Sequence, residues 1–240
     1  KLTPEGLSWV SMYWVFVFLT ALVAIVIALL RIPKIELKSD ETVGAWEVNK
    51  QLLKNKVVIL YFLGIFCYVG SEQGIGNWIS EFLKNYHGVN PETVGAGVVA
   101  NFWLVFAIGC GLGVIVLKLF NSKTVLKFAS LLAMVSLTVS LFAPLPVALY
   151  SFPAVGFFFS VMWSIIFSLA LNSVKGEHGT FSGILCTGII GGALIPAIIG
   201  WLADYIGLRF GMMFLYLTLG YILSIGFWSK PLIKNKTVFD

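Results

Sequence analysis

The sequence predicts an all-helical membrane protein, and two properties of the chain support that prediction. Of its 240 residues, 59% are hydrophobic and only 11% are charged, and the mean hydropathy is +0.95. Soluble domains carry about 25% charged residues, so the composition excludes that class. Long apolar runs also recur along the chain, and a helix needs about 20 apolar residues to cross the hydrocarbon core. We therefore expect a bundle of transmembrane helices.

Seven apolar runs are long enough to span a membrane. They cover Leu7–Leu30, Val57–Leu83, Thr93–Leu117, Val125–Phe142, Val147–Leu171, Phe181–Ala203 and Phe210–Trp228. One span, a polar linker and six further spans are the arrangement expected for the second half of a transporter with two six-helix halves. We expect residues 1–31 to hold the last transmembrane helix of an N-terminal half and residues 32–56 a cytosolic linker. Residues 57–240 then form a six-helix transport bundle with a short cytosolic tail.

The linker has two interpretations. It is polar, carries charges of both signs and contains the helix breaker Pro33, so an ordinary solvated loop is favoured. The alternative is a short helix with one apolar side lying on the membrane surface. Its face would be formed by Val43, Trp46, Lys50 and Leu53.

The second span contains a polar group that organises the rest of the chain. Glu72 falls near the middle of this span, where ionising a lone carboxylate costs several kcal/mol. Such a residue normally faces the bundle interior and marks a functional site. Gln73 and Asn77 share one helix face, and Tyr68 and Glu72 share an adjacent one. The alternative is a buried polar group that only joins helices.

Small residues mark the helix contacts. Gly70 and Gly74 are four residues apart, which lets a neighbouring helix approach closely. The sixth span has a longer stripe with the same period, formed by Gly188, Gly192, Pro196, Gly200 and Asp204. This stripe predicts close packing first, and a bend near Pro196.

Candidate binding residues combine two kinds of side chain. In sugar sites, aromatic rings stack on the C–H faces of the sugar, and amides and carboxylates form hydrogen bonds with its hydroxyl groups. The spans supply rings at Tyr68, Trp78, Phe159 and Trp163. Trp78 lies nearer the outer surface, where interfacial Trp is expected anyway, and it is set aside. The predicted substrate-binding residues are Glu72, Gln73, Asn77, Asn101 and Trp163.

The distribution of Lys and Arg predicts the orientation. Thirteen lie in alternate connections on one side: Arg31, Lys34, Lys38, Lys50, Lys54, Lys56, Lys118, Lys123, Lys127, Lys175, Lys230, Lys234 and Lys236. The other side has three: Lys1, Lys84 and Arg209. The positive-inside rule therefore places the linker and the C-terminus in the cytosol. The same asymmetry explains the net charge of +5 without a nucleic-acid partner.

Residues for catalysis or metal binding are sparse. Cys67, Cys110 and Cys186 lie far apart within apolar runs, which predicts packing roles and neither a disulfide framework nor a metal site. His87 and His178 have no partner at metal-ligand spacing. The chain has no nucleotide-binding glycine loop, so we expect no ATPase, no other enzyme activity and no cofactor. Uphill transport would draw on an ion gradient or on another subunit.

Several motifs resemble the fucose–proton symporter family of the major facilitator superfamily. Phe66-Cys-Tyr-Val-Gly-Ser-Glu72 resembles the start of the seventh helix of that family, and Phe167-Ser-Leu169 resembles its tenth. Thr187-Gly-Ile-Ile-Gly-Gly-Ala193, followed by Pro196, Gly200 and Ala203-Asp204, resembles its eleventh. The resemblance covers nearly the whole chain. It implies a bacterial inner-membrane transporter that moves a sugar such as fucose, glucose or galactose with a proton, by alternating access.

The resemblance also implies roles for particular residues and partners. In that family the first, fourth, seventh and tenth helices line the central cavity, and only the last two fall in this chain. Glu72, Gln73 and Asn77 lie on the seventh, and Trp163 takes the place of an aromatic residue on the tenth. The implied partners are the sugar, the proton, the lipid bilayer and the N-terminal half, which carries the acidic residues for proton coupling. Cys110 departs from the pattern, because the family often has Arg after the glycine that corresponds to Gly109.

Two other classes stay open. The same fold could serve a transporter for a non-sugar solute such as a drug or an organic anion, or a non-transporting membrane scaffold. The chain begins at Lys1 instead of Met, which indicates a fragment or a processed piece. An upstream half in the same gene would favour a transporter, and a start codon just before Lys1 would favour the scaffold.

Overall fold

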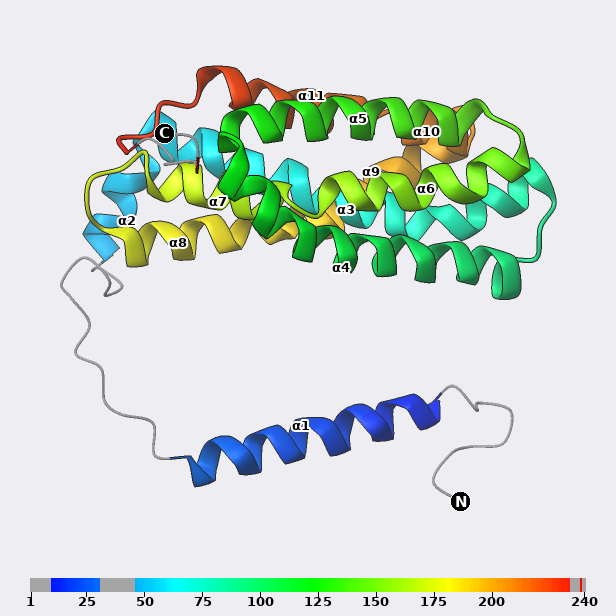
Figure 1. Ribbon diagram of the computed structural model, residues 1–240, viewed down its shortest axis with the longest axis horizontal. Helices are drawn as coiled ribbons and strands as arrows, with labels where there is room; N and C mark the ends of the chain where they lie inside the picture. Colours follow the sequence, from blue (N-terminus) through cyan, green and yellow to red (C-terminus); the bar gives the residue numbers. More distant parts are fainter. Residues whose placement is uncertain (1–9, 31–45, 234–237, 239–240) are drawn as a thin grey trace. The chain divides into compact units, whose positions relative to one another are not determined.

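The computed structural model describes residues 10–30, 46–233 and 238, and within them it contains helices and turns but no strand (Figure 1). Seven helical stretches in this part are long and apolar enough to cross a membrane. They are Ser11–Leu29, Lys56–His87, Pro91–Leu119, Ser122–Phe142, Leu145–Leu171, His178–Ile206 and Leu208–Trp228. The predicted fold class is therefore confirmed, and the chain is a multi-pass membrane protein.

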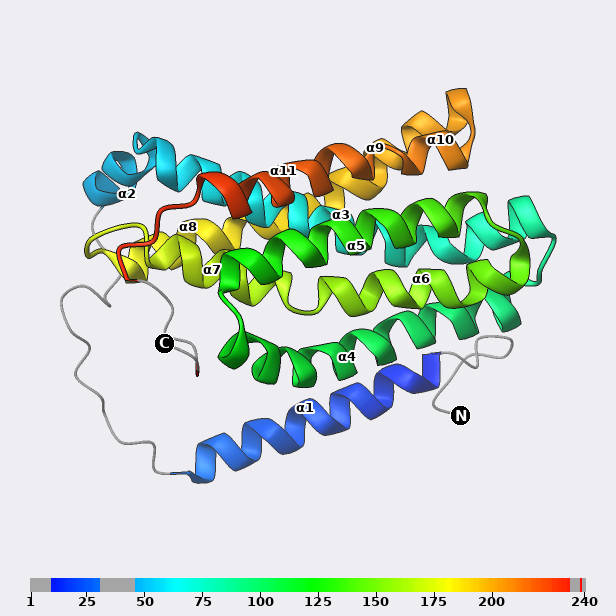
Figure 2. The ribbon, with the colours of Figure 1, turned by 45° about the horizontal axis from the view of Figure 1, so that its top comes forward.

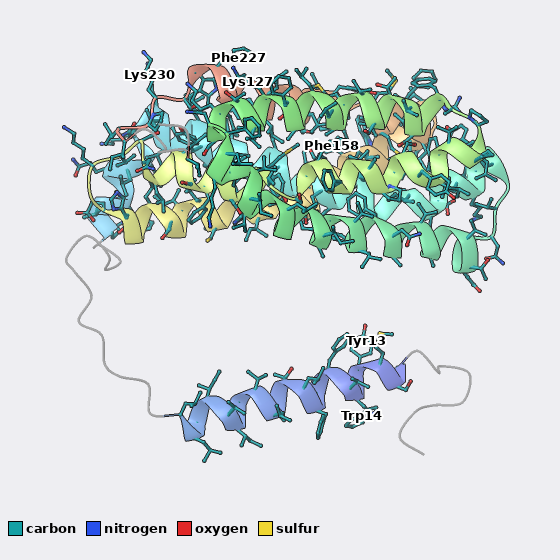
Figure 3. All side chains as sticks on the ribbon, in the orientation of Figure 1. Tyr13, Trp14, Lys127, Phe158, Phe227 and Lys230 are labelled. Carbon is teal, nitrogen blue, oxygen red and sulfur yellow. The ribbon has the colours of Figure 1, made fainter. Side chains whose placement is uncertain are left out.

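The chain divides into two units, Lys1–Lys38 and Ser39–Asp240. Helix α1 (Ser11–Leu29) belongs to the first unit and is apolar on all sides, with a mean hydropathy of 2.6 and no buried residue. Tyr13 and Trp14 project from its N-terminal part (Figure 3). A helix that is hydrophobic all round suits a membrane span. The start predicted at Leu7 lies outside the described residues.

The linker contains a short helix, α2 (Trp46–Leu53), so the loop interpretation is wrong for these residues. Helix α2 packs against α3 and α8 of the bundle, and Leu52 is only 8% exposed there. Trp46 and Leu53 lie on the outer side, 67% and 50% exposed, and the Lys50 Nζ lies 5.6 Å from the centroid of the Trp46 ring. The apolar outer side thus resembles the predicted surface helix, whereas Val43 lies outside the described residues.

Helix α3 (Lys56–His87) is the central element of the second unit. It contacts α4, α6, α7, α8, α9, α10 and α11, and its buried side runs along most of its length. Asn55 caps its start, because the side-chain oxygen accepts a hydrogen bond from the Val57 N–H at 2.9 Å. Gly88 ends it in the left-handed conformation, with φ of 67°.

The next three helices form a layer in which α6 lies between its two neighbours (Figures 1 and 2). The first begins with a π-helical turn, η2 (Pro91–Gly95), and continues as α4 (Ala96–Leu119). Helix α5 (Ser122–Phe142) and α6 (Leu145–Phe159) follow. Helices α4 and α5 both pack closely on α6 but touch each other little.

The fifth and sixth spans are interrupted. A turn at Ser160–Val161 separates α6 from α7 (Met162–Leu171). In the sixth span, α8 (His178–Thr187) passes through a 3₁₀ turn, η3 (Gly188–Ile190), into the next helix. Interruptions of this kind turn the helix axis and re-aim the side chains that follow.

The interruption in the sixth span does not fall where the sequence analysis expected the bend. Helix α9 (Gly191–Ile206) runs through Pro196, and the departure from α-helical geometry lies earlier, at η3. Gly188 lies directly over the Phe62 carbonyl of α3, so this turn forms where two backbones press together. The last span is also divided, into α10 (Leu208–Met212) and α11 (Leu215–Trp228).

Basic side chains gather near the end of the bundle where α11 finishes. The Lys123 Nζ donates a hydrogen bond to the Ser229 carbonyl at 2.6 Å. The Lys127 Nζ lies 5.1 Å from the centroid of the Phe227 ring, and Figure 3 shows both near Lys230. This is the end that the charge asymmetry predicts to be cytosolic.

Candidate functional site

The glycines of α3 and α9 bring the two helices into close contact. A Cβ atom added at Gly70 would overlap Ile195, and one added at Gly191 would overlap the carbonyl oxygen of Phe66. Gly192 lies over Val69 in the same way. These contacts agree with the close packing predicted for the stripe. They also fix the rotation of α3 against α9, which places Tyr68 and Glu72 near α7 and α4.

A buried hydroxyl pair holds α3 to α11 on another side. The hydroxyl groups of Ser71 and Thr218 are 2.6 Å apart, and the Ser71 hydroxyl also lies 2.7 Å from the Cys67 carbonyl. Both side chains are buried. Ser71 is therefore a polar group that joins helices, directly beside Glu72 in the sequence.

Glu72 is half-buried and meets polar neighbours on its own helix and across the bundle. The Gln73 Nε2 donates to the Glu72 Oε1 at 3.5 Å, and the carboxyl group also interacts with the Tyr68 hydroxyl. From α4, the thiol of Cys110 lies close enough to interact with it electrostatically. The predicted shared face of Tyr68 and Glu72 is thus present in the structure.

Aromatic rings adjoin this polar group. Tyr68 is 2% exposed, and its ring centroid lies 5.9 Å from that of Trp163 and 6.2 Å from that of Phe159. Trp163 in turn stacks on Phe167 at 5.9 Å, with an angle of 18° between the planes. The turn at Ser160–Val161 places Trp163 in the first turn of α7, where it can reach Tyr68 on α3.

Not all of the predicted residues come together. Asn77 and Asn101 are both exposed, and none of the contacts found among residues 46–233 joins either of them to Glu72. Asn77 lies one turn beyond Gln73 on α3, and Asn101 lies on the outer side of α4. The indole N–H of Trp78 donates to the carbonyl of Pro196 at 3.1 Å, so Trp78 contributes to the contact with α9.

Two open cavities lie along the exposed side of α7, where Ser164 and Ser168 are located. One, of about 570 Å³, is lined by Trp163, Phe167 and Asn172, and the other, of about 420 Å³, by Cys110 and residues of α4. Ser164 and Ser168 line both. Within the described residues, no three His, Cys, Asp or Glu side chains come together as a metal site.

Sequence reasoning missed two residues of this region. Cys110 was expected to be a packing residue, but it is exposed, and its Sγ lies 3.5 Å from the Ser160 carbonyl. Tyr68 was placed on the same face as Glu72, but its ring contact with Trp163 of α7 was not foreseen. For Cys110 the usable signal was its position directly after Gly109, where the motif departs from the family pattern.

The fold and the site together define a multi-pass helical bundle with a polar and aromatic face, as in one half of a secondary transporter. The sequence profile of the Major Facilitator Superfamily matches residues 2–189, and the chain belongs to this superfamily.

Individual relatives extend this finding. The chain is 32% identical over 205 residues to the glucose/galactose transporter of Brucella abortus biovar 1 (strain 9-941). The aligned region covers 85% of this chain and 49% of that protein. It is 29% identical over 183 residues to the putative glucose/galactose transporter of Helicobacter pylori (strain ATCC 700392 / 26695), covering 76% and 44%. The chain thus spans about half the length of these curated relatives.

Solved structures show the same fold. The bundle resembles a crystal structure of the transporter FucP in the outward conformation, with a TM-score of 0.76 and 22% identity, covering 96% of this chain and 59% of that one. A variant of the fucose:proton symporter FucP of Escherichia coli gives a TM-score of 0.75 at the same identity and coverage.

Proposed function

We propose that this chain is the C-terminal half of a proton-coupled sugar transporter that works by alternating access. The observation that carries the proposal is the contact between Tyr68 and Trp163 beside the Glu72–Gln73 pair. The similarity to glucose/galactose transporters over 85% of the chain supports a hexose substrate, and the likeness to a fucose:proton symporter in fold is consistent with proton coupling.

The arrangement suits a polyhydroxylated solute. A pyranose has apolar C–H faces that stack on Trp163, and hydroxyl groups that pair with the Glu72 carboxylate and the Gln73 amide. These polar groups are half-buried, and leaving a buried hydrogen-bonding group without a partner costs about 1–3 kcal/mol. The site therefore favours solutes that supply hydroxyl groups at these positions over apolar solutes of similar size.

The other wall of the cavity is proposed to come from an N-terminal half, of which α1 is the last helix. Transporters of this kind bind substrate between two related halves and rock one half against the other. The proton-coupling acids would lie on that missing half. The Lys and Arg asymmetry, with thirteen residues against three, supports an inner-membrane location with a cytosolic linker and C-terminus.

Counterflow of labelled sugar in liposomes tests this function. The transporter with both halves should exchange labelled glucose, galactose or fucose, whereas liposomes that hold only this chain should match empty ones. Exchange of an organic anion or a drug in place of sugar would establish the non-sugar alternative. Absence of transport for every solute by the two-half protein would favour a scaffold. Saturable sugar uptake by this chain alone would show that the six-helix unit is sufficient for transport.

A further inference from the structure

The outward side of α7 carries a row of serines that the proposed sugar site does not use. Ser164 and Ser168 are four residues apart in α7, so their Cβ atoms follow one another at about 5–6 Å along one side of the helix, with Ser160 in the preceding turn. Ser160 is buried in the turn before α7, whereas Ser164 and Ser168 are exposed. The row leads from the level of Trp163 toward Asn172, at the predicted cytosolic end.

The two exposed serines differ from other hydroxyl residues in the spans. Hydroxyl groups in apolar helices commonly donate to a carbonyl oxygen of the preceding turn. Ser71 and Ser130 do so at 2.7 Å. In the described part of the chain, no hydrogen bond is found for the side chain of Ser164 or Ser168. Their donors and acceptors are therefore available to a molecule beside α7.

The space beside these serines is large enough for a small solute. The cavities of about 570 and 420 Å³ on either side of the row both include Ser164 and Ser168 in their lining. Small-molecule sites in proteins typically enclose about 300–1,000 Å³. Both cavities therefore border the same two serines.

The chemistry of the lining selects the kind of solute. Trp163 and Phe167 are nearly parallel, at 18° and 5.9 Å, and form a flat apolar wall beside the hydroxyl groups. A lipid tail would match the wall but would offer the hydroxyl groups no intermolecular hydrogen bond. A molecule with both C–H faces and several hydroxyl groups satisfies both parts of the lining.

We propose that the Ser164–Ser168 row is a second sugar-binding station, which holds a monosaccharide on the cytosolic side of Trp163. The proposal rests on the transport function proposed above. On the proposed path, the sugar passes from Glu72 and Gln73 over the Trp163 ring to the two serines before it enters the cytosol. Ser164 and Ser168 then affect affinity on the cytosolic side and have little effect on affinity from outside.

Alanine variants in the two-half transporter test the station directly. Ser164→Ala with Ser168→Ala should raise the KM for sugar presented from the cytosolic side by about thirtyfold, because two hydrogen bonds of about 1 kcal/mol each are lost and 1.4 kcal/mol corresponds to about tenfold. The KM for sugar presented from outside should change less than twofold. The matched control is Ser130→Ala, which removes a buried hydroxyl that bonds within its own helix and should leave both KM values unchanged.

Cys110 provides a second readout, because it borders the same cavity. In a transporter whose other cysteines are replaced by Ala, saturating sugar should slow labelling of Cys110 by a small methanethiosulfonate reagent at least threefold. The Ser164→Ala, Ser168→Ala variant should lose this protection at the same sugar concentration.

The possible outcomes separate the two proposals. If the unmodified transporter carries sugar while the serine variants keep both the KM values and the protection of Cys110, the station is refuted and the transport function stands. If the variants lower the melting temperature and impair transport equally from both sides, the serines are packing groups, which also refutes the station. A transporter that carries none of the three sugars overturns the function and the station together.

Discussion

Helix α3 meets its neighbours with two faces of opposite character. Toward α9 it presents Gly70 and Gly74, and the side chains of Ile195 and Ile199 fill the space above them. Toward α4 and α7 it presents Tyr68, which contacts Trp163, and Glu72, which interacts with Cys110. Gln73 lies between the two faces, because its side-chain stem lies over Gly192 of α9 and its amide donates to Glu72. One face is closed by backbone contact, and the other carries the polar and aromatic contacts to α4 and α7.

This difference separates the residues that build the bundle from those available for a solute. On the α9 face the polar atoms are paired internally, as in the bond from Trp78 to the Pro196 carbonyl. On the α7 face, Ser164 and Ser168 line open space. Substitutions on the first face should therefore lower stability, and substitutions on the second should lower sugar affinity in a protein that remains folded.

The largest effect is expected for a methyl group added at the closed face. In Gly191→Ala the new Cβ would overlap the Phe66 carbonyl, which belongs to rigid backbone. Such overpacking typically costs about 1–3 kcal/mol, occasionally more, so the melting temperature in detergent should fall clearly. Gly183→Ala is the matched control in the same span, because nothing lies within 4 Å of the added Cβ. Equal melting temperatures for the two variants would contradict the close contact.

Two tryptophans allow the faces to be compared with the same substitution. Trp163→Ala should weaken sugar binding by about 1–2 kcal/mol, since the loss includes an aromatic contact beyond its buried area, while expression and melting temperature stay near wild type. Trp78→Ala should lower expression and melting temperature and leave sugar binding unchanged, because it removes the bond to Pro196 and the contact with Gly200. Binding isotherms and thermal scans on both variants measure this. Identical profiles for the two variants would remove the distinction between the faces.

A smaller effect is expected at the hydroxyl pair of α3 and α11. Ser71→Ala and Thr218→Val each remove one partner of the 2.6 Å contact, and interhelical hydrogen bonds in membranes are worth about 0.6 kcal/mol on average. A double-mutant cycle on unfolding free energy should give a coupling of about 1 kcal/mol or less, with no change in sugar affinity. A strong loss of sugar affinity would place this pair in the site.

The span positions and the shared face of Tyr68 and Glu72 could be predicted, because they depend on local hydrophobicity and on helical spacing. The interruptions could not. The turn at Ser160–Val161 has no Pro or Gly of its own, and it lies where Gly109 and Gly113 of α4 press against Ser160 and Val161. The turn at η3 likewise depends on contact between α9 and the backbone of α3. Such contacts involve residues far apart in the sequence, so the periodicity of one span does not reveal them.

The site residues divide in the same way. Glu72 and Gln73 could be found from their polarity within an apolar run. Asn77 and Asn101 have the same polarity, but they are exposed, and no contact with Glu72 is found for either of them in the described part of the chain. Cys110 and the serine row were overlooked because small, weakly polar side chains are common in packed membrane helices. Their position beside a cavity depends on how α4 and α7 cross.

The measurement that tests the account most directly is sugar affinity across pH for the two-half transporter and two variants at Glu72. Glu72→Gln keeps the shape and most of the hydrogen bonding but removes the ionisable carboxyl, so it should bind sugar and show an altered pH dependence of transport. Glu72→Ala should lose about 1–3 kcal/mol of affinity, because its polar neighbours are left unpaired. If Glu72 only joins helices, Glu72→Ala would instead lower expression and melting temperature, and the surviving protein would bind normally. Identical affinities and pH profiles for wild type and both variants would contradict the central claim that this carboxyl faces the sugar.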